Sequence, residues 1–426
     1  MDESATIAAV ATAPGRAGVA VVRVSGPEAW NIAFAMTRRA SPEKAPSVAF
    51  SRVRDASGGL LDECVVLYFR APRSYTGEDV VEFQCHGGTV TPRRILEACF
   101  TFGARLARRG EFTERAFLNG KLDYSQAESV IELIEAKTVR AADRAVSGLE
   151  GERRGDIRAL YDEAVEISSV IEHSLDVDEG ELPEGFIGRI AADVAVFRSH
   201  AETALKRRRE GKILRDGALV VLAGPPNAGK SSLMNALLGE SRAIVSDIAG
   251  TTRDSIEEWL DIGGWPVRLV DTAGIRESDD VIESEGVRRS EKLVASADVV
   301  VWLGEGAPEG VALSKTVLAR SKCDLSRADG VLNVSSVTGE GIEALKKSIA
   351  AILSASAESL DDTGVEYCGD TAVLDEVRRL VDLSCRDIVL AGNAMRLAAD
   401  KLGSLVGAVY SEDMLERLFS RFCVGK

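Results

Sequence analysis

The residues best suited to chemistry lie where a short apolar run, 218–223, gives way to a glycine-rich loop. The pattern G-x-x-x-x-G-K-S extends from Gly224 to Ser231, and helix-like residues follow it at 232–238. Glycines let consecutive backbone N–H groups point at phosphate oxygens, and the N-terminus of the following helix adds positive charge. Lys230 can reach the β and γ phosphates, while Ser231 can ligate Mg²⁺. A glycine-rich turn can match by accident, but the strand before it and the helix after it favour a phosphate-binding loop.

Two further motifs carry groups for the metal and the γ-phosphate. Asp-Thr-Ala-Gly at 271–274 follows a second apolar run, 267–270, so Asp271 stands at a strand end where its carboxylate can hold the metal through water. Between the two motifs, Gly-Thr-Thr-Arg-Asp at 250–254 offers Thr252 as a second hydroxyl ligand of Mg²⁺. This order of motifs is typical of a P-loop nucleotide hydrolase.

Two downstream segments are suited to base recognition. Ser-Lys-Cys-Asp occupies 321–324 and Ser-Ser-Val occupies 335–337, and Asp324 is a natural acceptor for the N1 and N2 donors of guanine. We therefore predict a Ras-like GTPase domain. Its predicted GTP-binding residues are Asn227, Ala228, Gly229, Lys230, Ser231, Ser232, Ser246, Asp247, Ile248, Ala249, Gly250, Thr251, Thr252, Asp271, Thr272, Ala273, Gly274, Ser321, Lys322, Asp324, Ser335, Ser336 and Val337.

Two positions restrict the mechanism. Ile275 follows the Asp-Thr-Ala-Gly motif, so the glutamine that positions water in Ras-like enzymes is missing and another group must do so. Asn227 places a neutral oxygen beside the phosphates, where it can help to hold a monovalent cation in place of an arginine finger.

Composition indicates several domains and no membrane span. The 426 residues are 45% hydrophobic, enough for two or three domains with cores of their own. No apolar run reaches the length of a transmembrane helix, and the acidic N-terminus lacks the basic start of a signal peptide, so we expect a cytoplasmic location. The net charge of −15 argues against coating nucleic acid unaided, but it allows RNA as a substrate held with a partner.

The cysteines and histidines indicate neither a disulfide framework nor a zinc site. The seven cysteines form no C-x-x-C pair and the three histidines form no cluster, so we expect reduced thiols. Cys85 and His86 are neighbours on an expected strand, where their side chains point to opposite faces. We therefore predict no catalytic dyad there.

The spacing of apolar residues divides the chain into segments. We predict an α+β domain at 1–118, a helical segment at 119–213, the GTPase domain at 214–356 and a second helical segment at 357–426. Helices on both sides predict that the GTPase domain is inserted into one helical bundle, so the fold class is multidomain, α/β and α. The expected elements include strands at 18–24, 65–69 and 80–84, helices at 91–102, 190–212, 374–390 and 394–409, and a polar linker at 355–364.

Several stretches together resemble the MnmE family, also called TrmE, of tRNA uridine-modification GTPases. They are residues 6–16, Ser-Tyr-Thr-Gly-Glu-Asp-Val at 74–80, the run 109–123 that begins Arg-Gly-Glu-Phe-Thr, and the terminal Phe-Cys-Val-Gly-Lys at 422–426. The resemblance covers nearly the whole chain. The P-loop is shared by a great many proteins, whereas the terminal motif joined to the N-terminal segments is highly specific.

The resemblance implies an N-terminal domain that binds a tetrahydrofolate derivative (5-formyl- or 5,10-methylene-tetrahydrofolate) and forms a homodimer. It also implies a flavoprotein partner, MnmG or GidA, in a heterotetramer-type complex without a membrane. With GTP as substrate and Mg²⁺ and K⁺ as cofactors, the pair would add a carboxymethylaminomethyl or aminomethyl group to C5 of wobble uridine 34 of certain tRNAs.

The resemblance also implies roles for single residues. Glu283 matches the glutamate that positions water and would be catalytic. Ser231 and Thr252 would hold Mg²⁺. The other implied contacts are Arg23, Glu82, Lys121 and Lys426 to the folate, and Asn227, Ser246, Ile248 and Thr251 to K⁺. Without the resemblance, Arg23 or Glu82 would be read as ordinary exposed strand-end charges.

One departure concerns the base site, where the family usually has N-K-x-D and this chain has Ser321 first. A serine supplies one hydrogen bond where asparagine makes two, so we expect weaker nucleotide binding, by about 1 kcal/mol, with the preference for guanine retained through Asp324.

Two alternative functions remain open from the residues. A ribosome-assembly-type regulatory GTPase shares the nucleotide motifs but does not explain the N-terminal segments, and folate binding would discriminate it. A folate-dependent one-carbon transferase with a degenerate nucleotide site is disfavoured by the complete phosphate and metal motifs.

Overall fold

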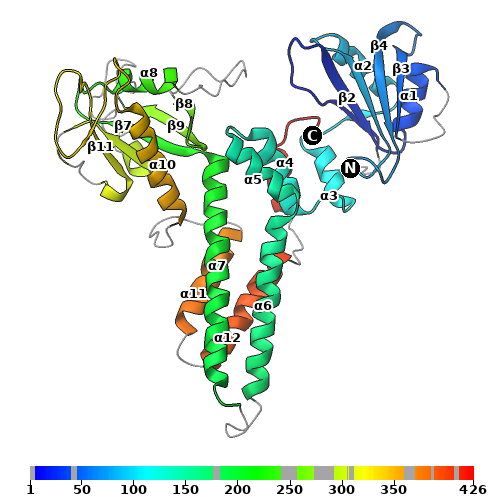
Figure 1. Ribbon diagram of the computed structural model, residues 1–426. Coiled ribbons are helices and arrows are strands. Elements are labelled where there is room, and N and C mark those ends of the chain that lie inside the picture. Colours follow the sequence, from blue (N-terminus) through cyan, green and yellow to red (C-terminus); the bar gives the residue numbers. More distant parts are fainter. Residues whose placement is uncertain are drawn as a thin grey trace. The chain divides into compact units, whose positions relative to one another are not determined.

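The computed structural model describes most of the chain. The described residues are 5–39, 46–175, 183–240, 257–272, 292–304, 306, 311–358, 370–384, 388–406 and 412–426. The chain divides into two compact units, and Figure 1 shows their helices and strands coloured along the sequence. The first, the N-terminal unit, comprises Met1–Ile131 with Val409–Lys426, and the second comprises Glu132–Ala408.

The N-terminal unit is built on a six-stranded sheet in the order β3-β4-β5-β2-β1-β6. Helices α1 (Ala29–Thr37) and α2 (Thr91–Thr101) pack against one face, in a core that they share with alternate residues of the central strands. The strands are β1 (Ile7–Val10), β2 (Val19–Ser25), β3 (Ser47–Arg54), β4 (Leu60–Phe69), β5 (Val80–His86) and β6 (Arg105–Leu106). Because neighbouring residues of a strand point to opposite faces, Arg23, which lies between two core valines, is directed away from these helices.

The C-terminal tail folds against the start of α3 (Glu111–Leu118) within the N-terminal unit. The backbone N–H of Phe112 donates to the carbonyl of Lys426 at 3.2 Å, and that of Gly110 donates to Cys423 at 3.4 Å. Gly425 has φ 107° and a Cβ built on it would lie 2.3 Å from the carbonyl oxygen of Val10, so the approach to β1 requires glycine. Helix α13 (Glu412–Ser420), which precedes the tail, contacts α3, and α4 (Tyr124–Glu135) continues from this unit into the second.

The second unit contains long helices from both sides of the nucleotide motifs. Buried apolar residues of α6 and α7, from Ile157 to Leu205, share one core with those of α11 and α12. The four helices lie side by side in Figure 1. Their stripes of aliphatic residues at helical spacing explain this packing. The bounds are α5 Val139–Leu149, α6 Glu152–Leu175, α7 Phe186–Asp216, α11 Asp370–Ser384 and α12 Ile388–Val406.

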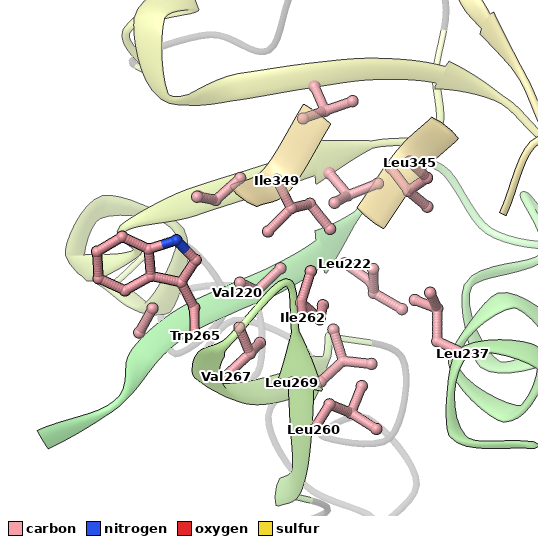
Figure 2. Close-up of a cluster of buried hydrophobic side chains, with 14 of the residues drawn as sticks. Val220, Leu222, Leu237, Leu260, Ile262, Trp265, Val267, Leu269, Leu345 and Ile349 are labelled. Atoms are coloured by element: carbon pink, nitrogen blue, oxygen red, sulfur yellow. The ribbon is translucent and has the colours of Figure 1, made fainter. Parts of the chain in front are cut away.

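The second sheet follows α7 and has the order β12-β11-β10-β7-β9-β8. Its strands pair in parallel except for the antiparallel pair β8–β9. The strands are β7 (Ala218–Ala223), β8 (Glu257–Ile262), β9 (Trp265–Asp271), β10 (Val299–Trp302), β11 (Thr316–Arg320) and β12 (Leu332–Asn333), accompanied by α8 (Lys230–Glu240), η2 (Leu313–Lys315) and α10 (Ile342–Glu358). Figure 2 shows the buried core, in which Leu345 and Ile349 of α10 approach Val220 and Leu222 of β7. Parallel strands collect ligand-binding loops at their carboxyl ends.

The β8–β9 hairpin is joined to the helices of its own unit. Thr138, the N-cap of α5, donates its hydroxyl to the carbonyl of Gly264 at 2.9 Å. The guanidinium of Arg140 lies 4.0 Å from the ring centre of Trp265 and 2.6 Å from a carboxylate oxygen of Glu210 on α7. Since Trp265 begins the strand that ends at Asp271, a rigid β-strand connects these helices with the metal motif.

Several expected boundaries differ from the structure. The second helix of the C-terminal pair begins at Ile388, so Leu390 belongs to it and not to the helix before. The expected linker at 355–364 starts too early, because Ala355–Glu358, which have side chains compatible with a helix, form the last turn of α10 and residues 359–364 lie outside the described residues. Among the described helices, none combines the length and the apolar character needed to cross a membrane.

Candidate functional site

The phosphate-binding loop connects β7 with α8. All residues of β7 are buried, and Gly224 leaves the strand with φ 146°. A Cβ on Gly224 would lie 3.1 Å from the carbonyl group of Leu303, so a side chain would crowd the turn. Asn227 (φ 60°) and Gly229 (φ 89°) also have left-handed backbone conformations, and α8 begins at the next residue. The predicted order of strand, loop and helix is confirmed.

Lys230 is directed into the loop. It is 7% exposed, and its ammonium donates to the carbonyls of Gly224 and Pro225, both at 2.9 Å. The loop therefore encloses a buried cation beside the N-terminus of α8, and both would attract the phosphates of a nucleotide.

The predicted metal-binding groups on two neighbouring elements are in contact. The hydroxyl of Ser231 on α8 donates to the Oδ2 of Asp271, at the end of β9, at 2.6 Å. Asp271 is 3% exposed, and Thr272 after it donates its hydroxyl to the carbonyl of Leu222 at 3.0 Å. A hydroxyl and a carboxylate are hard oxygen ligands, so this donor pair fits Mg²⁺ better than a soft metal.

The Ser-Lys-Cys-Asp segment follows β11 and lies against the phosphate-binding loop. The hydroxyl of Ser321 donates to the carbonyl of Ala228, and the ammonium of Lys322 donates to the carbonyl of Asn227 at 3.1 Å. Cys323 is buried, and its backbone N–H donates to the carbonyl of Val334 at 3.1 Å. Asp324 is exposed, as a group that reads a base must be.

The Ser-Ser-Val segment at 335–337 positions Asp324. The buried hydroxyl of Ser335 donates to the Oδ1 of Asp324 at 2.7 Å and accepts from the backbone N–H groups of Val337 and Thr338 at 3.3 and 3.2 Å. Sequence reasoning placed Ser335 near the base but did not assign this positioning role. Ser336 follows it, and Val337 is exposed.

Other predicted nucleotide-site residues lie outside the described residues, and their predicted roles stay predictions. They are Ser246, Asp247, Ile248, Ala249, Gly250, Thr251, Thr252, Ala273, Gly274 and Glu283. Asn227 and Ser232 are described and exposed.

A second candidate site lies on the face of the N-terminal sheet that does not pack against α1 and α2. Arg23 of β2 and Glu82 of β5 are opposite each other in the register, and the Nε of Arg23 donates to Glu82 at 2.7 Å. The guanidinium lies 5.4 Å from the ring centre of Tyr75 and 5.6 Å from that of Phe112. Its Nη1 is buried and has no hydrogen-bond partner, so a donor remains available for a ligand.

Lys426 brings a second cation to this cluster. Its ammonium lies 5.7 Å from the ring centre of Tyr75. Burial lowers the pKa of Lys426, and the nearby Arg23 lowers it further, whereas Glu82 opposes the shift. We call Arg23, Tyr75, Glu82, Phe112 and Lys426 the cationic cluster. Two cations beside one carboxylate and two aromatic rings suit an anionic ligand that also has a flat ring system.

The residues expected to bind the folate do not all lie in contact with the cationic cluster. Lys121 contacts the loop that carries Tyr75, where its ammonium donates to the carbonyl of Pro72 at 3.2 Å, but no described contact joins it to Arg23. Tyr75 and Phe112 were not predicted as site residues, although both lie in the quoted motifs. The prediction that Cys85 and His86 point to opposite faces of their strand is confirmed, because Cys85 is buried, with its thiol pKa raised by burial to about 11, and His86 is exposed and hydrogen-bonded to Asp62.

Comparisons with known proteins identify relatives over nearly the whole chain. Residues 6–121 match the family model of the GTP-binding protein TrmE N-terminus, and residues 124–423 match that of the MnmE helical domain. The tRNA modification GTPase MnmE of Azoarcus sp. (strain BH72) is 41% identical over 446 residues, covering 99% of this chain and 98% of the relative. The protein of the same name from Dichelobacter nodosus (strain VCS1703A) is 41% identical over 452 residues, covering 99% of each chain. A solved G domain of the T. maritima FeoB iron transporter is 30% identical and covers 32% of this chain and 98% of its own, with a TM-score of 0.24.

Proposed function

Because the chain belongs to the MnmE family of tRNA modification GTPases, we propose that it binds and hydrolyses GTP and couples this reaction to the modification of a tRNA base. The observation that carries the proposal is the contact between Ser231 and Asp271 beside the buried Lys230. These groups supply metal ligands and a phosphate-binding cation at the carboxyl end of a parallel sheet. The ribosome-assembly alternative is not favoured, since the family match extends over both the N-terminal and the helical segments.

At the nucleotide site, each described residue has a distinct task. Lys230 neutralises charge on the β and γ phosphates, and the N-terminus of α8 binds their oxygens. Ser231 and Asp271 would hold Mg²⁺, which supplies electrostatic stabilisation of the transferred phosphoryl group when it is bound. Asp324 accepts from guanine, while Thr252 and Glu283 are proposed as the second hydroxyl ligand and the group that orients water.

The proposed tRNA reaction assigns the cationic cluster to the one-carbon donor. A reduced folate has a flat pterin and an anionic glutamate tail, and the buried unpartnered Nη1 of Arg23 supplies the kind of donor that such a ligand needs. We propose that a homodimer of the chain works with a flavoprotein of the MnmG type at C5 of uridine 34. The contacts of Thr138 and Arg140 with the β8–β9 hairpin support coupling between the nucleotide site and the helices.

Full-length protein is expected to hydrolyse GTP about tenfold faster in KCl than in NaCl at equal ionic strength, because a bound cation adds electrostatic stabilisation of the transition state. Asn227, Ser246, Ile248 and Thr251 are the proposed ligands of that cation. The matched variant is Asn227→Gly, which removes the side-chain oxygen at a position with φ 60° that glycine tolerates. It should hydrolyse GTP at similar rates in both salts. Equal rates in the unmodified protein would refute the cation site and leave GTP binding untouched.

Arg23→Gln is expected to weaken binding of 5-formyl-tetrahydrofolate about tenfold, because the ligand loses a charge-assisted hydrogen bond. Isothermal titration calorimetry on the full chain measures the affinity. The control is Arg52→Gln on β3, whose side chain is 68% exposed and which should bind as the unmodified protein does. Unchanged binding by Arg23→Gln, with thermal unfolding also unchanged, would remove the cationic cluster from the proposal.

A further inference from the structure

In the segment proposed to bind the base, the hydroxyl of Ser321 already donates a hydrogen bond to another part of the protein. Ser321 begins the Ser-Lys-Cys-Asp segment after β11, and its hydroxyl donates to the carbonyl of Ala228 in the phosphate-binding loop. The side chain lies close to this loop, since a Cβ built on Gly229 would be 3.4 Å from the Oγ of Ser321. A hydroxyl has one proton. In this arrangement the Oγ of Ser321 offers only lone pairs to a bound base.

Guanine presents different groups on its two edges. N1 and N2 carry protons, whereas N7 and O6 are acceptors. Asp324 suits the first edge, because a carboxylate that accepts one bond from Ser335 retains lone pairs for two further donors. N7 requires a donor from the protein. An asparagine amide has two N–H protons and could serve the loop and N7 together, but a serine cannot.

The neighbouring cation is also bound to the loop. Lys322 has φ 57°, and its ammonium donates to the carbonyl of Asn227 at 3.1 Å. The segment thus uses both donor side chains to hold the phosphate-binding loop. Its acceptor, Asp324, is the exposed group that faces outward for recognition.

We propose that this chain recognises guanine through its N1 and N2 edge without a hydrogen bond to N7, so that N7 of the base contributes nothing to affinity. Ser321 is then a specificity-determining residue that fixes the loop at the expense of one base contact. The proposal rests on the proposed GTP site and extends it to the atoms of the base that are read. It predicts that nucleotides altered at N7 are accepted as readily as natural ones.

The test compares GDP with 7-deaza-GDP, in which N7 is replaced by a C–H group of nearly the same shape. Calorimetric titration of the full chain with Mg²⁺ should give affinities that agree within about twofold, since no hydrogen bond is lost. Ser321→Asn should bind GDP about fivefold more tightly and 7-deaza-GDP with unchanged affinity, because only N7 can accept the added proton. The matched control Ser321→Ala should weaken both nucleotides equally, because it removes the bond to Ala228 alone.

The outcomes separate this proposal from the proposed function. Binding of 7-deaza-GDP to the unmodified protein at least about fivefold weaker than GDP, the loss expected for one hydrogen bond, would overturn the inference and leave the GTPase assignment intact. Equal tightening of both nucleotides by Ser321→Asn would also overturn it, because position 321 would then act only on the loop. Inosine diphosphate, which lacks the N2 amine, should bind more weakly than GDP. Failure of every nucleotide to bind would overturn the proposed function and this inference together.

Discussion

Replacing Lys230 with alanine is expected to lower GTP turnover by at least about a hundredfold, the typical effect of removing one preorganised group that stabilises transition-state charge. The ammonium is buried and lies 2.9 Å from the carbonyls of Gly224 and Pro225. It is therefore held by the same loop whose N–H groups would surround the phosphates, and its charge acts where water is largely excluded. Release of inorganic phosphate at saturating GTP measures the loss.

The control for this experiment is a lysine from the same sheet region. Lys315 ends η2 (Leu313–Lys315) and is exposed, so Lys315→Ala should keep turnover within about twofold, as is usual for surface substitutions. Titration with GDP shows whether Lys230→Ala still binds nucleotide. If Lys230→Ala retained more than about a tenth of the turnover, the loop would not be the place of phosphoryl transfer.

The phosphate-binding loop could be predicted from sequence because its structure is local. A buried strand, two glycines and a lysine at the first position of a helix lie within fourteen residues, 218–231, and each has a preference that agrees with the others. Ser231 and Asp271 also followed from the sequence, since Ser231 lies at the start of the helix after β7 and Asp271 ends β9, which pairs with β7 in parallel. The bond between Ser335 and Asp324 did not, because it depends on the loop conformation after β12.

The cationic cluster is not local, and its composition could not be worked out from spacing. Arg23 meets Glu82 through the register of β2 and β5, and Lys426 arrives from the other end of the chain. Arg23, Glu82 and Lys426 were named from the family resemblance. Tyr75 and Phe112 were missed because a buried or partly buried aromatic residue is usually part of a core, and it is the unpartnered Nη1 of Arg23 beside them that points to a ligand.

Some elements had weak sequence signals for physical reasons. β3 (Ser47–Arg54) is an edge strand with exposed Val48 and Phe50, so its apolar residues do not mark one buried face. β8 (Glu257–Ile262) begins with two acidic residues, which are uncommon in strands. Both are held by pairing with a neighbouring strand, which a local pattern does not reveal.

Glu111→Gln is expected to lower the free energy of unfolding of the N-terminal unit by about 3 kcal/mol, because it removes one partner of a buried ionic network. Glu111 is 2% exposed and begins α3. Its carboxylate accepts from Arg105 at 2.5 and 2.8 Å, from the backbone N–H of Arg108 at 2.8 Å and from Arg115 at 3.1 Å. Hydrogen exchange of peptides covering 111–118 in the full chain should rise about a hundredfold at pH 7, the equivalent of that energy.

The same substitution tests whether this network positions the cationic cluster. The backbone N–H of Phe112, the next residue, donates to the carbonyl of Lys426, so loosening of α3 should also raise exchange in the tail at 422–426. The control is Glu97→Gln on α2, whose side chain is 61% exposed and 3.5 Å from Arg93. An exposed pair of this kind contributes little, and exchange should stay within about twofold.

The effect of Glu111→Gln should depend on pH in a defined direction. Burial raises the pKa of Glu111, but hydrogen bonds from Arg105, Arg108 and Arg115 outweigh it and lower the pKa from 4.5 to about 2. The carboxylate therefore stabilises the fold fully above about pH 4.5, and this contribution is lost as the pH falls toward about 2, because the unfolded chain takes up the proton first. The unmodified protein and Glu111→Gln are compared at the same pH, so that intrinsic exchange rates cancel. Their hydrogen-exchange rates at 111–118 should differ about a hundredfold at pH 7 and only about tenfold at pH 3. A difference that stayed constant between these pH values would mean that packing, and not the charge of Glu111, holds the start of α3.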